Sequence, residues 1–295
     1  MNERISEILN GIKIYDGVYK RELIDAAIEL REEITPYLIE ILNKVLSDPS
    51  VYIEHNDYYD HIYALMLLGH FEEQRAHKVI VDLFSLPDDI PHDLFGDLTT
   101  SDLPVILLRT CGGAMDMIKS LALNKGANDY CRISALNAMA YAVVEGIMSR
   151  EDVLSFYGSL FTGHETDLDS DFWGLLANLV CDLYPEELMD TINKAYKDDL
   201  ISPGMIRYEE FEDELKEGKE RCLEKLRIDF QSRSLDDIHE SMSWWACFKQ
   251  ENKPVSSSFV ESFGMVDQSK NKSKKKKHRK KKRKMAKASK RKNRR

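Results

Sequence analysis

Apolar residues recur along this chain at the spacing of an α-helix that is buried on two sides. Between residues 130 and 147 one helical face carries, at steps of three, four and seven, Ile133, Leu136, Ala140, Val143, Val144 and Ile147. A second apolar stripe beside it contains Ala135, Met139 and Ala142. A helix that is apolar on two sides packs between neighbours rather than on a surface. The pattern therefore predicts a central helix inside a stack of helices.

Similar helix pairs are predicted before and after this segment. The first helices of successive pairs begin near Leu23, Tyr63, Leu103, Ile133 and Phe172, at intervals of 40, 40, 30 and 39 residues. These intervals approach the length of HEAT-type helical hairpins. Each hairpin buries its apolar face only against its neighbours. We therefore predict an all-α fold, a HEAT-like α-solenoid of about five helical hairpins with terminal capping helices.

Capping residues and prolines predict several helix boundaries. Thr35 is a suitable N-cap and Pro36 a suitable first helical residue, so we expect one helix to end and the next to begin there. Ser101 is expected to cap a later helix. Ser149, with Asp152 three residues further on, resembles a capping box.

The segments near the end of the periodic region are less regular. Residues 87–101 are expected to form a longer connection, and residues 204–230 one or two acidic amphipathic helices. A last helix is predicted over residues 235–248. Because atypical terminal helices usually cap a solenoid, we expect Trp244 and Trp245 to form a hydrophobic lid, with a partner-binding role as the alternative.

Composition is consistent with a folded protein of the cytoplasm. Hydrophobic residues make up 43% of the 295 residues, which is enough for a substantial core. The amino-terminal stretch is charged and lacks the apolar core of a signal peptide, and no run of apolar residues is long enough to span a membrane. The five cysteines are widely spaced, which favours reduced thiols over a disulfide framework.

The charge is divided unevenly along the chain. Residues 270–295 contain 18 Lys or Arg and no Asp or Glu, which leaves 24 basic residues against 51 acidic ones in residues 1–269. We therefore divide the chain into a helical repeat domain (1–250), a linker (251–269) and a Lys/Arg-rich tail (270–295) that is expected to be disordered.

The basic tail predicts contact with a polyanion. A dense run of Lys and Arg is attracted to phosphate backbones by counterion release, with little base preference. His278 is its only aromatic ring, so stacking on bases should contribute little. Nucleic acid, ribosomal RNA or another anionic surface is the expected ligand, and a solvated solubility tail is the alternative. The residues assigned to polyanion binding are Lys274, Lys275, Lys276, Lys277, Arg279, Lys280, Lys281, Lys282, Arg283 and Lys284.

Four segments resemble a bacterial family of proteins catalogued as domain of unknown function 1186. They are ELREEITPYLIEILNKVL (29–46), HIYALMLLGHFEEQRAHKVIVDLF (61–84), GDLTTSDLPVIL (96–107) and SWWACFK (243–249). The resemblance implies a HEAT-like helical fold in a bacterial protein and implies no activity. Some members carry a cysteine-rich zinc module of the SEC-C type at the carboxyl terminus. This chain has no cysteine after Cys247, so a zinc-dependent role is not carried over.

One group of residues could support chemistry. His55, His61, His70 and His77 lie close in sequence to Glu54, Asp57, Asp60 and Glu73. Imidazole and carboxylate together suit zinc or iron, although hydrogen-bonded or solvated histidines would show the same pattern. No nucleophile elbow, P-loop or dinucleotide-binding glycine pattern is present. Gly112-Gly113 is interpreted as a turn, and Cys111 and Cys131 as core thiols.

These patterns favour a non-enzymatic, cytoplasmic helical-repeat adaptor. Its acidic solenoid would bind a protein partner, and its tail would contact nucleic acid or the ribosome. We assign no catalytic residue, cofactor or metal ligand. The competing hypothesis is an enzyme with a metal or hydrolytic site near residues 54–77 or in the 87–101 connection.

Overall fold

The computed structural model describes residues 2–55, 57–167 and 170–248. Within these residues every regular element is a helix, and the only β-type pairing is an isolated antiparallel bridge between Ile14 and Tyr58. The predicted all-α fold class is therefore confirmed. Residues 1–249 form one compact unit, and the predicted linker and tail lie outside the described residues.

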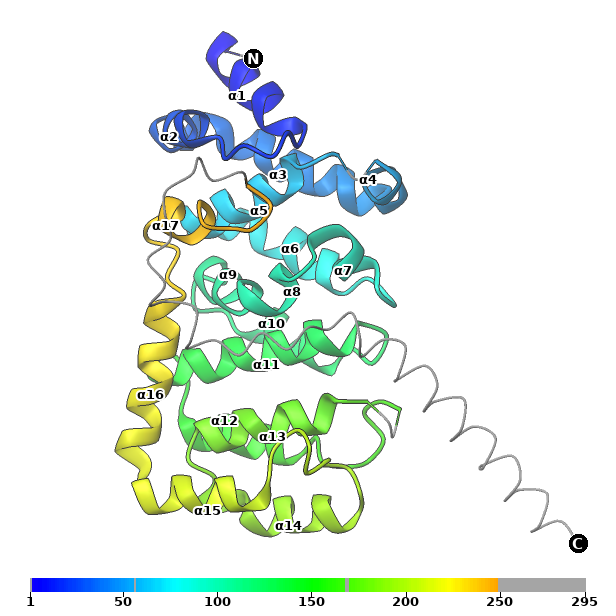
Figure 1. Cartoon of the computed structure of the whole chain (residues 1–295), viewed down its shortest axis with the longest axis vertical. Coiled ribbons are helices and arrows are strands. Elements are labelled where there is room, and N and C mark those ends of the chain that lie inside the picture. The colour runs from blue at the N-terminus through cyan, green and yellow to red at the C-terminus, as the bar shows by residue number, and fades with distance from the viewer. Residues whose placement is uncertain (1, 56, 168–169, 249–295) are drawn as a thin grey trace, which may run out of the picture. The chain divides into compact units, whose positions relative to one another are not determined.

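Figure 1 shows the helices in chain order. They are α1 (Glu3–Lys13), α2 (Arg21–Glu29), α3 (Arg31–Ser47), α4 (Pro49–Glu54), α5 (Asp60–His70), α6 (His77–Phe84), α7 (Ile90–Phe95), α8 (Leu98–Ser101), α9 (Leu103–Thr110), α10 (Asp116–Leu123), α11 (Asp129–Val144), α12 (Arg150–Gly158), α13 (Phe172–Asp182), α14 (Met189–Lys197), α15 (Tyr208–Glu217), α16 (Lys219–Ser232) and α17 (Ile238–Met242), with short 3₁₀ turns at Gln74–Ala76 and Glu186–Leu188.

The hairpins stack in sequence order. The first helices of successive hairpins, α5, α9, α11 and α13, each contact the next in the series, and α3 packs on α5 and α6 at the amino-terminal end. On the second layer, α6 contacts α10. Because each layer packs on its neighbours in this way, the apolar faces form one continuous core, as in an α-solenoid.

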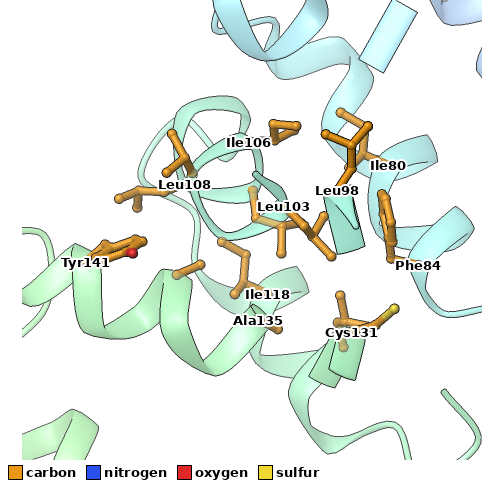
Figure 2. Packing of buried hydrophobic residues seen from close by; sticks show 14 of the residues in the cluster. Ile80, Phe84, Leu98, Leu103, Ile106, Leu108, Ile118, Cys131, Ala135 and Tyr141 are labelled. Carbon is orange, nitrogen blue, oxygen red and sulfur yellow. The ribbon is translucent and has the colours of Figure 1, made fainter. Parts of the chain in front are cut away.

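The centre of this core is α11, as its double apolar stripe predicts. Ala135, Leu136 and Met139 are at most 1% exposed. Figure 2 shows Ala135 and Cys131 of α11 near Leu103 of α9 and Ile118 of α10. Two-sided burial is therefore confirmed, and the helix ends at Val144, just before Gly146.

The boundary predicted at Thr35 and Pro36 is wrong. The break between helices lies at Leu30, and α3 continues through Pro36. The Thr35 hydroxyl donates a hydrogen bond back to the carbonyl oxygen of Arg31 at 2.7 Å rather than capping a new helix. Pro36 is the sixth residue of α3 and lacks the N–H that would donate to the carbonyl oxygen of Glu32, and the helix continues despite the loss of this one backbone hydrogen bond.

Other local predictions had mixed outcomes. Residues 87–101 contain the short helices α7 and α8 instead of an irregular connection, and the Ser101 hydroxyl bonds to the Asp97 carbonyl at 3.0 Å instead of capping α9. The Ser149 cap is confirmed, because its hydroxyl accepts a hydrogen bond from the Asp152 N–H at 3.1 Å. The turn at Gly112-Gly113 is also confirmed, with both residues at positive φ.

The last helices form a C-terminal strap (residues 208–248) instead of a cap on one end of the stack. From α13 the strap runs back along the stack, where α16 contacts α11 and α13 and α17 contacts α5 (Figure 1). Trp245 stacks on Phe248 with ring centroids 5.9 Å apart, whereas Trp244 is 65% exposed. The predicted hydrophobic lid is therefore wrong for Trp244. No helix among the described residues is long and apolar enough to cross a membrane.

Candidate interaction surfaces

The C-terminal strap follows the carboxyl-terminal ends of the first helices. At the end of α5, His70 Nδ1 donates to the Leu235 carbonyl oxygen at 2.7 Å. Near the end of α11, the Tyr141 hydroxyl donates to Asp229 at 2.6 Å. These bonds fix the path of the strap along one edge of the stack.

Arg109, near the end of α9, connects three elements. Its guanidinium donates to the carbonyl oxygen of Gly69 at 3.0 Å, caps the end of α5, and reaches Asp236 of the strap at 2.7 Å. Gly69 lies at a close approach of stack and strap. A Cβ at this position would lie 3.0 Å from side-chain atoms of Ile106 and of Leu235, so a larger residue would require these side chains to shift.

An aromatic cluster anchors the far end of the strap. Phe248 is 4% exposed and lies among the rings of Tyr19, Tyr59 and Tyr63. His239 of α17 is hydrogen-bonded to the Tyr19 hydroxyl and to Asp25 of α2, each at 2.8 Å. The strap thus joins the last helical pair to the first one.

Carboxylates face each other where the middle of the strap meets α13. Asp182, the last residue of α13, remains accessible to solvent, but dense protein surroundings and the negative charges of Asp229 and Glu214 raise its pKa to about 7. Lys225 opposes this effect only weakly, because its ammonium group pairs with Glu214 and Glu217 of the strap at 2.8–2.9 Å. The carboxylate of Asp182 forms no hydrogen bond or ion pair with another described residue.

The opposite end of α11 borders a hollow of about 530 Å³. The connections that precede α7, α11 and α13 line this open hollow. We call this site the loop hollow, and its lining residues are Asp88, Asp89, Lys125, Gly126, Ala127, Asn128, Asp129, His164, Glu165, Thr166 and Asp167. Five of these are carboxylates and one is a lysine, so a cationic ligand matches its charge.

A buried arginine organises the loop hollow. Arg132 is completely buried, and its guanidinium contacts the carboxylates of Asp129 at 3.0 Å and of Glu165 at 3.3 Å. The same group lies 4.3 Å above the ring of Phe172 and donates to the Glu165 carbonyl oxygen. Because a buried charge needs a partner of opposite charge, this network fixes the 162–167 connection against α11.

The histidines of residues 54–77 have separate partners. His61 Nε2 is hydrogen-bonded to the Leu94 carbonyl oxygen at 2.8 Å, and His77 Nδ1 to the Thr110 hydroxyl at 2.9 Å. His70 contacts the strap, and His55 lies beside the ring of Tyr58. Among the described residues, no group of three or more His, Cys, Asp or Glu side chains is arranged to hold a metal ion.

Two buried groups near α5 lack partners. Asp60 Oδ1 and His61 Nδ1 make no hydrogen bond within the described structure and stand 4.0 Å apart. Burial raises the pKa of Asp60 to about 6 and lowers that of His61 to about 4. Burial therefore makes protonated Asp60 and neutral His61 more populated than they would be in water at the same pH.

The sequence predicted some of these positions and missed others. Cys111 and Cys131 are buried, as expected, whereas the ten assigned tail residues, Lys274–Lys277 and Arg279–Lys284, lie outside the described residues. Arg132 was overlooked, although a basic residue inside a two-sided apolar stripe is an available signal of a buried ion pair. Asp182 has no comparable signal, because the residues that face it lie more than thirty positions away in sequence.

This architecture defines an all-α protein of stacked helical hairpins. The chain belongs to the family described as protein of unknown function (DUF1186), whose profile matches residues 3–249. An uncharacterized protein of Chlamydia muridarum is 35% identical over 243 residues, which cover 82% of this chain and 96% of the relative. An uncharacterized protein of Chlamydia trachomatis is 34% identical over 246 residues, covering 83% and 97%. No solved structure matches the chain.

Residues 250–295 fall outside the family match. Only 3–4% of each Chlamydia relative lies outside its own match, so these relatives leave little length for a counterpart of the 46 residues.

Proposed function

We propose that this protein is a non-enzymatic helical-repeat adaptor that binds a protein partner through the loop hollow. The observation that carries this proposal is a hollow of about 530 Å³ in which five of the eleven lining residues are carboxylates and one is a lysine. A rigid stack that presents connection residues at one edge is a common way to place a binding surface on a repeat scaffold. The partner chemistry that fits is an exposed segment carrying Lys or Arg.

The charges of the hollow divide into fixed and available groups. Glu165 is buried and paired with Arg132, and Lys125 lies 3.3 Å from it. Asp88 and Asp167 are exposed at the rim. Because the inner charges are already paired, the rim carboxylates supply the attraction for a cation, and the inner network keeps the rim in place.

The test is cross-linking of the full chain in its native cell, followed by identification of captured proteins. A variant with D88N and D167N should lose the specific partner, because both changes remove rim charge without touching the Arg132 network. The matched control, D190N with D213N, removes one carboxylate from α14 and one from α15, away from the hollow, and should retain the partner. Equal capture by both variants would contradict a role for the hollow. The competing hypothesis of a metalloenzyme predicts stoichiometric iron or zinc in the purified protein.

We further propose that the basic tail binds a polyanion such as RNA. This proposal rests on sequence alone, namely 18 basic and no acidic residues in positions 270–295. If the tail neutralises about 6–10 phosphates, affinity for RNA should fall about 10³–10⁵-fold between 50 and 200 mM salt. Titration of one labelled RNA with the native chain and with a chain whose tail order is scrambled measures this. Similar affinities are expected for both chains, and salt-independent binding would exclude the electrostatic mechanism.

A further inference from the structure

The rim of the loop hollow carries an exposed aromatic ring. Tyr130, in the first turn of α11, is 45% exposed. Its hydroxyl donates a hydrogen bond at 3.3 Å to the carboxylate of Asp171, the residue before α13. The side chain therefore extends from the connection before α11 towards the connection before α13, and both connections line the hollow. Since most of the surface of a tyrosine side chain belongs to its ring, this exposure leaves part of the ring open to a ligand.

One amide side chain places a carboxylate beside this ring. The Asn128 side chain accepts a hydrogen bond from the Tyr130 N–H at 2.9 Å and donates one to the Asp89 carboxylate at 3.2 Å. Asp89 is exposed and forms no ion pair with another described residue. Burial raises the pKa of Tyr130, and three neighbouring carboxylates raise it further, those of Asp171, Asp129 and Asp89. The rim thus offers an open ring and an unpaired carboxylate that are fixed by the same side chain.

Two arginines of this protein are held by the same combination of groups. The guanidinium of Arg150 lies 5.5 Å from the ring of Tyr184 and donates to both oxygens of Glu187 at 2.6 Å. The guanidinium of Arg132 lies 4.3 Å above the ring of Phe172 and also pairs with carboxylates. A planar guanidinium can stack on a ring and bind a carboxylate through two N–H groups, whereas an ammonium group acts as a point charge. A site made of a ring and a carboxylate therefore favours arginine over lysine.

We propose that the loop hollow selects an arginine of its partner, whose guanidinium stacks on Tyr130 and pairs with Asp89. This inference rests on the proposed function, since it names the residue type in the basic segment that the hollow binds. The exposed rim carboxylates Asp88 and Asp167 attract any cation, whereas the ring distinguishes a guanidinium from an ammonium group. Tyr130 is thus the specificity-determining residue of the hollow, and its hydrogen bond to Asp171 orients the ring.

Matched peptides test this selection with the full chain. The probes are two labelled, end-capped Gly-Ser peptides of equal length that carry either Arg or Lys at the same positions, and an uncharged Gly-Ser peptide is the blank. Fluorescence anisotropy at low salt measures their affinities for the native chain, Y130L and Y130F. Y130L replaces the ring by an aliphatic side chain, whereas Y130F keeps the ring and loses only the bond to Asp171. Circular dichroism verifies that each variant is folded.

The native chain should bind the arginine peptide about three- to tenfold more tightly than the lysine peptide, because the exposed ring adds a stacking contact to a charge attraction that both peptides share. The ratio of the two affinities should fall to about one in Y130L and persist in Y130F. Equal affinities for the native chain, or a preference for arginine that survives in Y130L, would overturn the selection while the hollow remained a cation-binding site.

The double variant D88N with D167N separates this inference from the proposed function. Loss of rim charge should weaken the binding of both peptides by a similar factor and leave their ratio unchanged, because Tyr130 and Asp89 are still present. If neither peptide binds the native chain more tightly than the uncharged blank, or if the double variant leaves both affinities unchanged, the proposed function fails and the inference fails with it.

Discussion

The two ends of α11 carry carboxylates in opposite electrostatic situations. At its amino-terminal end, Asp129 and Glu165 are paired with the fully buried Arg132. At its carboxyl-terminal end, burial and the charges of Asp229 and Glu214 disfavour the ionised form of Asp182 and raise its pKa. The two strap carboxylates pair with cations of the strap, Asp229 with Arg233 at 3.2 Å and Glu214 with Lys225 at 2.9 Å. Only the first end therefore holds its carboxylates with a fully buried cation.

This difference separates rigid from mobile parts of the protein. The Arg132 network binds a connection to the stack and keeps the loop hollow in shape. The strap is held by apolar anchors at its two ends, and α16 between them buries only Cys222 and Leu226. Four measurements test this distinction, taken from the largest expected effect to the smallest.

Truncation of the strap should have the largest effect. A chain ending at Phe230 loses the buried side chains of Leu235, Ile238, Met242 and Phe248, each worth about 1.5–3 kcal/mol of burial. It should aggregate or unfold when tested by circular dichroism and size-exclusion chromatography. A chain ending at residue 250 retains these anchors and should melt like the full chain. If the chain ending at Phe230 were soluble and fully helical, the strap would not contribute to the fold.

Loss of the buried arginine should be the next largest effect. R132M leaves the buried carboxylate of Glu165 without its guanidinium partner and should lower the free energy of unfolding by about 3–5 kcal/mol. Urea denaturation measures this loss. The control R227M breaks an exposed pair with Glu224 and should cost about 0–1 kcal/mol. Similar costs for the two variants would remove the contrast between the ends of α11.

Core and strap leucines should respond differently. L136A and L176A remove fully buried side chains and should each cost about 2–5 kcal/mol of global stability. L226A should instead accelerate hydrogen exchange mainly at residues 223–232, because α16 opens before the stack unfolds. Uniformly faster exchange along the whole chain in L226A would place α16 in the same cooperative unit as α11.

The smallest effect concerns the pH dependence of stability. The folded-state pKa of Asp182 is raised to about 7, so its ionisation opposes folding; this penalty is absent below about pH 4, grows up to about pH 7 and is constant above it. D182N should therefore match the native chain near pH 4 and exceed it by about 1 kcal/mol at pH 8, a reduced figure because the group is solvent-accessible.

The charged groups around Asp182 set the control for this measurement. Asp229, Glu214 and Lys225 of the strap face it, and it in turn raises the pKa of the buried Tyr157 in α12. Lys216 lowers the pKa of the exposed Asp213, so D213N should gain no stability as pH rises. Thermal melts at several pH values compare the variants, and a D182N difference that does not change with pH would contradict the assignment.

Local patterns alone predicted the all-α class, the central helix α11 and some of the helix boundaries. The period of apolar residues in 130–147 predicts both the helix α11 and its burial on two sides, because helical geometry fixes which side chains share a face. The Ser149 cap and the Gly112-Gly113 turn are likewise properties of a few adjacent residues. The predicted helix boundary at Thr35-Pro36 was wrong because a Thr-Pro pair is compatible with a helix start but does not require one. Here α3 packs against α5 and α6 and continues through Pro36.

Only the tertiary structure decided which charged residues pair and that the C-terminal strap packs against the amino-terminal helices. Arg132 meets Glu165 across 33 positions, and Tyr19 meets His239 across 220. The sequence predicts that residues 235–248 form a helix that caps the end of the stack. In the structure their apolar side chains are instead buried against α5 and the amino-terminal segment. Helical periodicity specifies which face of a segment is apolar, and the partner of that face depends on the path of the chain, which hydrogen bonds and packing between distant segments determine.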